Sequence, residues 1–225
     1  MNLKKSVDNL KKYYDNHLWV LILVAVLIIL AMGLIEYLMG RLVICKCNYV
    51  LFWYNNVNGP GNSQHLFDWY SFSHIIHGMF YYFLLRSVAK RLPVKTRFLF
   101  ALLIETSWEV FENSPFIINR YRTATFALDY YGDSIINSVF DVFSMGLGFI
   151  LARKLPPWLT ATLAIALELF TLYMIRDNLA LNILNLIYPT ESVKDWQTAG
   201  TNMKNMSLLI FLGVKFRLLK LKIFK

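Results

Sequence analysis

The sequence is poor in charged residues: Asp, Glu, Lys and Arg make up 16% of its 225 residues, whereas 57% are hydrophobic. So few charges cannot cover a water-soluble surface, and a mean hydropathy of +0.45 is typical of integral membrane proteins. In a soluble protein, the net charge of +9 would favour nucleic acid as a partner. Here the basic residues flank apolar segments, where they contact lipid headgroups and set the topology. We therefore expect membrane lipids, and no nucleic acid, as partners.

Cysteine is also scarce. The only two, Cys45 and Cys47, form a C-K-C sequence, and two thiols are too few for a disulfide framework. They are either a structural pair, reduced or disulfide-bonded, or part of a soft-metal or redox site that needs further ligands. The sequence leaves this choice open.

Two further patterns are missing. The sequence contains no complete metal-ligand motif such as H-E-x-x-H, so no single motif predicts a metal site. It also shows no internal repeat, which weighs against a transporter built from inverted repeats.

Long apolar runs are abundant, and several approach or exceed the roughly 17–25 residues that a membrane-spanning helix needs. We predict an all-α, polytopic transmembrane bundle of five to six helices in a single integral-membrane domain, residues 17–189. The first run is too long for a cleavable signal peptide and is expected to remain as an anchor. Residues 1–16 are expected to form a cytoplasmic amphipathic tail, and residues 190–225 a polar and then basic interfacial tail. The predicted spans are about 17–39, 70–89, 98–112, 133–152 and 158–175, followed by a short helix at 178–189.

The distribution of Lys and Arg predicts the orientation. A cytoplasmic N-terminus places eleven of these residues in inside segments and four in outside loops, as the positive-inside rule requires. Three smaller expectations accompany this topology: Glu36 lies at the membrane interface, Asp133 caps the N-terminus of the fourth helix, and residues 116–132 form an aromatic loop.

The segment ETSWEVFE carries the strongest functional signal. Glu105, Glu109 and Glu112 stand at i, i+4 and i+7 and so share one helix face. A carboxylate at the bilayer centre costs about 2.5–3.5 kcal/mol, so three of them need partners, protons or a metal ion. At about 1.5 Å per residue, the costly side chains of four helices fall in the outer half of the bilayer, which predicts a polar pocket there. The other members are His74, His77, Asn137, Asp141 and Glu168.

Imidazole and carboxylate ligands suit zinc, iron or manganese, and such groups on facing helices hold metals in helical bundles. A metal-bound water would permit hydrolysis of a lipid-linked or phosphorylated ligand. The candidate metal ligands are His74, His77, Glu109 and Glu112. The candidate acid/base residues are Glu105, Glu109 and Asp141. The candidate ligand-binding residues are Arg120, Arg122, Asn137 and Glu168, with the two arginines suited to a phosphate headgroup.

Two alternatives remain at this point. The polar cluster is a structural network that joins helices by hydrogen bonds, or it belongs to a small transporter whose Glu, Asp and His side chains relay protons. The sequence does not decide whether the protein is an enzyme, and it leaves the oligomeric state open.

Four stretches also resemble a known family: GNSQHLFDWYSFSHIIHG, IETSWEVFENSPFIINRYR, DYYGDSIINSVFDVFSMGLGF and IRDNLALNI. They are similar to an uncharacterised, domain-of-unknown-function family of proteobacterial, mainly alphaproteobacterial, inner-membrane proteins. The resemblance covers roughly residues 40–198. It implies a multi-pass protein of the bacterial inner membrane, and it brings no established activity or active-site residues. More distantly, the W-E-x-x-E and D-x-x-x-N-x-x-x-D helices, with a histidine near the start of another helix, resemble VanZ-like membrane proteins.

Overall fold

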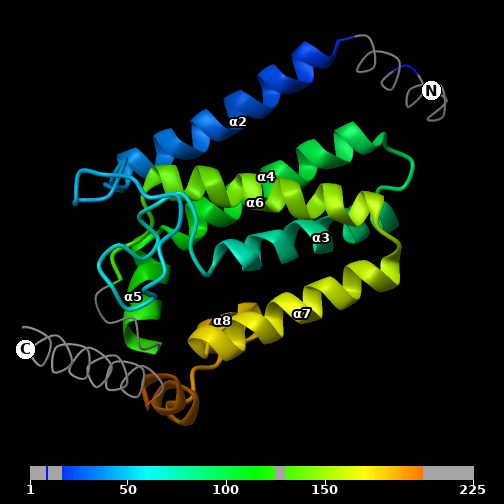
Figure 1. The fold of residues 1–225 in the computed structure, drawn as a ribbon. Helices are drawn as coiled ribbons and strands as arrows, with labels where there is room; N and C mark the ends of the chain where they lie inside the picture. The colour runs from blue at the N-terminus through cyan, green and yellow to red at the C-terminus, as the bar shows by residue number, and fades with distance from the viewer. Residues whose placement is uncertain (1–8, 10–16, 125–129, 200–225) are drawn as a thin grey trace, which may run out of the picture.

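The computed structural model describes residue 9 and residues 17–124 and 130–199, and it is helical. Within these ranges no β-strand occurs, and the only β-type pairing is an isolated bridge between Trp53 and Phe67. The predicted all-α class is therefore confirmed, whereas the expected cytoplasmic and basic tails lie almost wholly outside the described residues. The helices are α2 (Leu18–Leu38), α3 (Ser71–Val88), α4 (Val94–Glu112), α5 (Pro115–Ala124), α6 (Ile135–Lys154), α7 (Pro157–Ile175) and α8 (Leu179–Ile187) (Figure 1).

Three of these helices, α2, α6 and α7, are long and apolar enough to cross a membrane. The predicted count of five to six spans remains a prediction. Helices α3 and α4 fall short of the composition of a free-standing span because they carry the two histidines and the three glutamates singled out above. Their polar residues need the shelter of the other helices.

Helices α3 and α6 run in the same direction and form the centre of the bundle (Figure 1). A Cβ atom at Gly148 would meet the carbonyl group of Ile75, with the carbonyl carbon at 2.8 Å, and a Cβ atom at Gly78 would lie 2.7 Å from the backbone nitrogen of Phe149. Only glycine permits this approach of the two backbones. The surrounding apolar core includes Met79, Tyr82, Ala101, Met145 and Phe149.

The outer helices flank this pair. Helix α2 packs on α4 and α6, and α7 packs on α3 on the other side of the bundle (Figure 1). Most of α2 is exposed, including Leu23, Leu27, Leu30 and Leu34. An apolar helix with so little of its surface covered is suited to face lipid.

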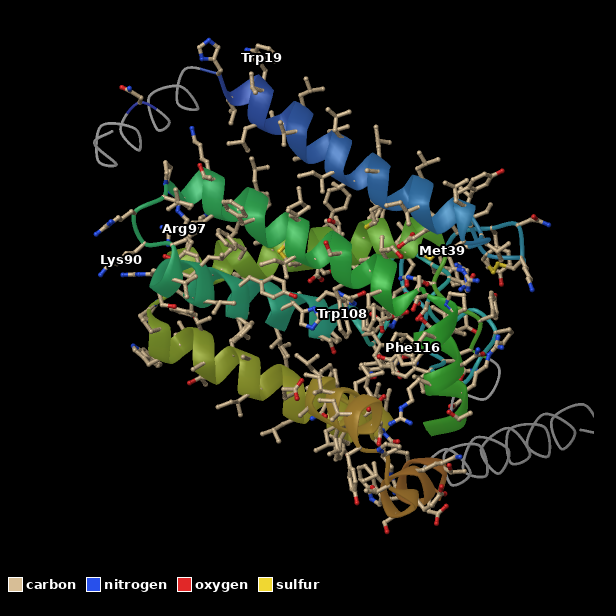
Figure 2. All side chains as sticks on the ribbon, turned by 180° about the vertical axis from the view of Figure 1, so that it is seen from behind. Trp19, Met39, Lys90, Arg97, Trp108 and Phe116 are labelled. Carbon is tan, nitrogen blue, oxygen red and sulfur yellow. A yellow bond between two sulfur atoms is a disulfide. The ribbon has the colours of Figure 1, made fainter. Side chains whose placement is uncertain are left out.

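The two ends of the bundle differ in character. The loop between α3 and α4 carries Lys90 and leads to Arg97, and we call this the basic end (Figure 2). The opposite end, which we call the pocket end, includes Met39 and Phe116 and gathers the segments 39–70, 113–124 and 130–134 (Figure 2). The buried polar groups described below lie toward the pocket end.

Two expectations about the pocket end were wrong. Residues 116–132 were expected to form a loop, but α5 occupies Pro115–Ala124. Ser114 starts this helix, since its carbonyl oxygen accepts from the Ile118 amide at 3.0 Å and its hydroxyl from the Ile117 amide at 3.4 Å. Proline at the first helical position needs no amide hydrogen, so Pro115 stops α4 and also begins α5.

Asp133 is not the cap of α6. Ser134 is the N-cap, and its hydroxyl accepts from the Asn137 amide. Asp133 instead accepts hydrogen bonds from Tyr130 and Asn113. The serine takes the capping position because the aspartate is engaged in the pocket.

Glu36 was expected at the interface, but it is completely buried. Its helix packs closely on α6 one turn earlier, where a Cβ atom at Gly33 would lie 3.2 Å from Ile135 Cγ2. The cysteine question is also resolved, because Cys45 and Cys47 form a disulfide. Residues 191–199, expected to be part of a polar tail, are helical.

Candidate functional site

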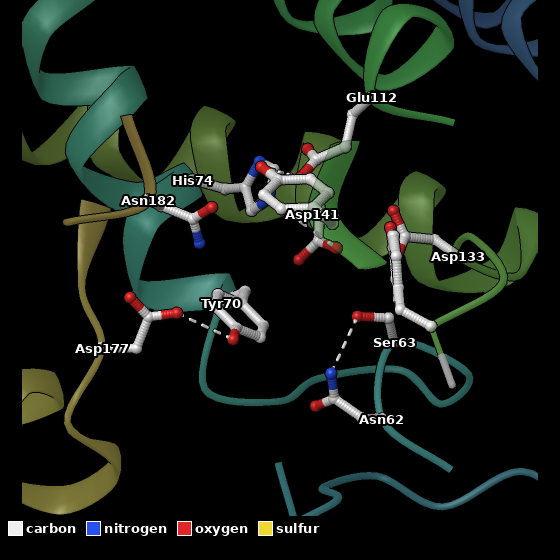
Figure 3. Close-up of a pocket in the computed structure, with 11 residues that line it drawn as sticks. Asn62, Ser63, Tyr70, His74, Glu112, Asp133, Asp141, Asp177 and Asn182 are labelled. Carbon is white, nitrogen blue, oxygen red and sulfur yellow. Dashed lines mark hydrogen bonds and ion pairs between the residues drawn. The ribbon is translucent and has the colours of Figure 1, made fainter. Parts of the chain in front are cut away.

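A pocket with an empty volume of about 490 Å³, partly open to solvent, lies at the pocket end between α3, α4, α6 and the segment after α7 (Figure 3). Its wall is strongly acidic. Among the described residues, the ionisable groups besides tyrosine are His74, Glu112, Asp133, Asp141 and Asp177, and none of the described lysines or arginines lines it. The other polar lining residues are the tyrosines Tyr70, Tyr121 and Tyr130, together with Asn62, Ser63 and Asn182.

His74 lies between carboxylates from two other helices. Its Nδ1 is 2.6 Å from Glu105 Oε1 and 3.3 Å from Glu109 Oε1, both on α4. Its Nε2 is 3.9 Å from Asp141 Oδ2 on α6. Ser71 fixes the relative position of α3 and α6, because its hydroxyl donates to Asp141 Oδ1 at 2.9 Å. Spacing of i, i+4 on α4 presents Glu105 and Glu109 to the same imidazole.

His77, about one turn further along α3, extends the cluster. Its Nδ1 lies 3.3 Å from Glu105 Oε2, so the two histidines share one carboxylate. The ring of Trp108 lies edge-on to the His77 ring, with centroids 6.0 Å apart. This places an aromatic wall beside the second histidine.

Two groups of three side chains in this cluster bring ligand atoms within 4.8 Å of one another: His74, His77 and Glu105, and His74, Glu109 and Asp141. Both groups contain His74. Glu112, also predicted as a metal ligand, lines the same pocket, where Tyr121 donates to its Oε1 at 3.1 Å.

Several carboxylate oxygens here are incompletely satisfied. Glu105 Oε2 and both oxygens of Glu109 are buried and have no hydrogen-bond partner among the described residues. Glu105 Oε2 is close to His77 but not in hydrogen-bonding geometry. An ionised carboxylate without partners is costly in such surroundings, so these oxygens need a proton or a cation.

Asp177 closes the far side of the pocket, directly after α7. It accepts a hydrogen bond from the Tyr70 hydroxyl at 3.0 Å (Figure 3). It also accepts from the Asn178 amide at 3.0 Å and from Gln197 Nε2 at 3.1 Å. Burial nevertheless raises the pKa of Asp177 to about 7, because the cost of desolvating the charge exceeds the gain from these bonds. Asp177 therefore exchanges a proton near neutral pH.

Four residues predicted to bind a ligand have other contacts. Arg120 Nε donates to the Leu186 carbonyl at 3.0 Å, at the end of α8, and Arg122 Nε donates to the Tyr130 carbonyl. Glu168 accepts from the first amides of α8, and Asn137 Nδ2 donates to the His65 carbonyl at 2.9 Å.

None of these four predicted ligand-binding residues lines the pocket. They hold α8, the connection before α6 and the connection before α3 in place around it.

Several other lining residues are hard to recognise from the sequence. Tyr70, Tyr121 and Tyr130 sit among many aromatic residues of an interfacial sequence, and Asn62, Ser63 and Asn182 sit in or beside loops. Asp177 has a weak signal, as an acidic residue directly after an apolar span. Only the folded connections bring these residues to the histidine.

A second pocket, with an empty volume of about 350 Å³, adjoins the first and shares Tyr70, His74, Glu112, Tyr121 and Asn182 with it. It adds Ser73 and His77 from α3. Its remaining wall is apolar and consists of Trp108, Leu179, Ile183 and Leu186. The combined cavity is polar at one side and apolar at the other.

Comparisons with known proteins identify the family of this chain. Residues 36–199 match the family described as "Protein of unknown function (DUF2585)". A UPF0314 protein of Rhizobium etli is 55% identical over 179 residues, which are 80% of this chain and 91% of that protein. The chain belongs to this family.

Other UPF0314 members extend the comparison. One from Rhizobium johnstonii is 50% identical over 192 residues, covering 85% of this chain and 97% of that protein. One from Sphingopyxis alaskensis is 48% identical over 178 residues, covering 79% and 95%. No solved structure matches the chain. All lining residues of both pockets, from Asn62 to Leu186, fall inside the range that matches the UPF0314 family's domain.

Proposed function

We propose that this UPF0314 protein binds a divalent metal ion in the pocket and uses it to hydrolyse a lipid-linked or phosphorylated ligand. The observation that carries the proposal is Glu109. Both of its carboxylate oxygens are buried without a hydrogen-bond partner, although one of them is 3.3 Å from His74. A cation held between Glu109, His74 and Asp141 would satisfy these oxygens and balance the acidic wall.

The donor set favours zinc, iron or manganese, since it combines imidazole with carboxylates. Each group of three side chains leaves at least one coordination position for water or substrate, as catalytic metal sites require. A metal there acts as a Lewis acid on a phosphoryl or carbonyl oxygen. In the proposal, Glu105 orients His74 and His77, and Asp141 and Glu109 bind the metal.

The charge of the wall also limits the ligand. A bare phosphate would be repelled by the acidic lining, to which the described part of the chain contributes no lysine or arginine. An anionic headgroup can bind there only through the metal. Arg120 and Arg122, whose guanidinium groups donate to backbone carbonyls, enter the proposal as supports of α8 and of the loop before α6.

The orientation belongs to the same proposal. The protein is then a multi-pass protein of the bacterial inner membrane whose N-terminus lies in the cytoplasm. In this orientation the basic end faces the cytoplasm and the pocket end faces the periplasm. The Cys45–Cys47 disulfide is at the pocket end, and disulfides persist in the oxidising periplasm, which supports this orientation.

One competing function has an observation in its favour. The contacts of Ser71 with Asp141 and of His74 with Glu105 join α3 to α6 and α4, and a purely structural network would use the same contacts. A structural network, however, gains nothing from a glutamate whose two oxygens have no hydrogen-bond partner. A proton-relaying transporter is the third candidate.

The test is elemental analysis of the purified protein by metal mass spectrometry. We expect wild-type protein to hold near-stoichiometric zinc, iron or manganese, and Glu109→Gln to lose it. Glu168→Gln is the matched control, because Glu168 is also a glutamate of an apolar helix but caps α8 outside the pocket. Wild-type protein that takes up none of the three metals, even on reconstitution, would overturn the proposal.

Hydrolysis is tested on the metal-loaded protein. We expect release of inorganic phosphate from the water-soluble ester p-nitrophenyl phosphate or from phosphatidic acid, lost on chelation and in Glu109→Gln. Metal binding without release of phosphate from either compound would leave a metal-binding protein and remove phosphate-ester hydrolysis from the proposal.

A further inference from the structure

One face of α3 leads out of the cavity along the helix. Ser73, His77, Phe80 and Leu84 stand at i, i+4, i+7 and i+11 and therefore share a face, which we call the α3 stripe. The first two residues line the second pocket, and the last two are uncovered, with Phe80 60% and Leu84 37% exposed. The stripe thus changes from polar and enclosed to apolar and open.

Between Ser71 and Leu85 the other residues of α3 are buried or half-buried, and only Arg86, Ser87 and Val88 at the basic end are also exposed. Gly78 and Tyr82 pack on α6, and the side chains of His74 and Tyr81 are directed toward α4. Phe72 contacts Phe170 of α7. The stripe is the face that remains between α4 and α7, and toward the pocket end α8 covers it with Leu179, Ile183 and Leu186.

We propose that the α3 stripe holds the hydrocarbon chain of the substrate, so that the substrate is a membrane lipid whose phosphorylated headgroup lies at His74. This inference rests on the proposed function for the headgroup. The apolar side of the cavity is continuous with the polar side, because the two pockets share five residues including His74. A ligand that fills both sides must be amphiphilic.

The geometry fits a lipid of the leaflet at the pocket end. From His77 to Leu84 the stripe runs about 10 Å along the helix, at 1.5 Å per residue, away from the pocket end and toward the middle of the bundle. A lipid with its headgroup at the membrane surface has its chain pointing the same way. The side wall formed by Trp108 and Ile183 would contact the first part of that chain.

The experiment uses photo-crosslinking of the full-length protein in lipid nanodiscs. The probe is phosphatidic acid with a diazirine in its acyl chain, and the adducts are mapped by mass spectrometry. The internal reference is the exposed apolar face of α6, with Phe143, Leu147 and Ile150, which any surrounding lipid contacts. We expect several-fold more adducts on Phe80 and Leu84 than on this reference, and removal of only the α3 adducts by excess unlabelled phosphatidic acid.

Two variants of α8 sharpen the result. Ile183→Trp fills the pocket side of α8, whereas Ile187→Trp places the same side chain on a residue that is 74% exposed and does not line the pocket. We expect the first to reduce the α3 adducts several-fold and the second to leave them unchanged. Equal labelling of α3 and α6, or α3 labelling that survives competition, would overturn the inference.

Metal content is measured on the same preparations, so that the two proposals fail separately. Preferential α3 labelling of a protein that binds no metal would support the α3 stripe as the site of the hydrocarbon chain and would reject the metal-dependent function. Metal binding and hydrolysis of p-nitrophenyl phosphate without preferential α3 labelling would reject only the hydrocarbon-chain site on the α3 stripe.

Discussion

Helices α3 and α6 are held together in two ways along their length. Toward the pocket end, Ser71 and His74 approach Asp141 through side chains, at 2.9 Å and 3.9 Å. About one turn further on, the backbones themselves are in contact at Gly78 and Gly148, and beyond them Tyr82 and Phe149 pack ring against ring. The first region is held by polar side chains, next to buried carboxylate oxygens that lack hydrogen bonds among the described residues, and the second is held by close packing.

The closely packed region therefore contributes stability, and the polar region contains the candidate chemical groups. Close packing of backbones and aromatic rings tolerates no added atoms, so it fixes the distance between the helices. The polar region has buried carboxylate oxygens that lack hydrogen bonds among the described residues, and folds commonly give up stability in this way at functional sites. Substitutions in the two regions should therefore have effects of opposite sign on stability.

The largest loss of stability caused by a substitution is expected at Gly148. Its replacement by alanine brings a methyl group against the Ile75 carbonyl, and only a shift of the α3 backbone relieves that contact. Overpacking costs about 1–3 kcal/mol, and a backbone contact belongs at the upper end, which lowers the Tm by roughly 6–12 °C. Thermal unfolding in detergent measures this change.

Gly146→Ala is the matched control, two residues earlier on the same helix. Its nearest contacts would be ring atoms of Phe98 at 3.7 and 3.8 Å, which is ordinary packing. The intrinsic helix preference of alanine over glycine then makes Gly146→Ala neutral or stabilising by up to about 1 kcal/mol. Equal stabilities of the two variants would contradict the assignment of Gly148 as the point of closest approach.

A second effect, on the pH dependence of stability, is expected from Asp177, at the edge of the pocket. Because burial raises its folded pKa from 3.8 to about 7, the folded state binds more protons than the unfolded state between these values. The contribution of Asp177 to the free energy of unfolding is therefore greatest below about pH 4. It falls as pH rises toward 7, by at most about 1.4 kcal/mol per pH unit.

Asp177→Asn removes the titrating group and keeps the oxygen that accepts from Asn178 and Gln197. We expect a flatter dependence of Tm on pH between 4 and 7 than in wild type, with the gain in stability of the variant largest at pH 7. A pH profile that is unchanged by the substitution would show that Asp177 is already ionised in the folded protein at acidic pH.

The helical pattern of the sequence predicted the class of fold, the positions of the long apolar helices and the residues that meet at His74. These follow from periodicity: Glu105 and Glu109 share a face whatever the tertiary structure, and a bilayer or a core forces that face inward. The loops were less accessible, because nothing local distinguishes a tyrosine that hydrogen-bonds an aspartate, as Tyr70 does, from one of many interfacial tyrosines.

The errors have a common physical cause. Glu36 and Glu168 were interpreted from their depth along a single helix, and Arg120 from its place in an outside loop. The contacts of Arg120 and Glu168 are instead with α8, and Glu36 is buried. Helix α5 was missed because residues 116–132 were interpreted as an aromatic loop, although Pro115 suits the first position of a helix.

The last effect, at Glu109, is expected to be the smallest and has the opposite sign to that at Gly148. Glu109 lies among Glu105 and Asp141, so in the metal-free protein its carboxylate adds like charge to a buried acidic cluster. Glutamine has nearly the same shape, carries no charge and donates hydrogen bonds to the neighbouring carboxylates. We therefore expect Glu109→Gln to raise the stability of metal-free protein by on the order of 1 kcal/mol, or roughly 2–4 °C in Tm, and to eliminate the further gain that wild type shows on adding metal. A fall in Tm without metal would instead identify Glu109 as a structural contact and would favour the network of helix-joining hydrogen bonds over a metal site.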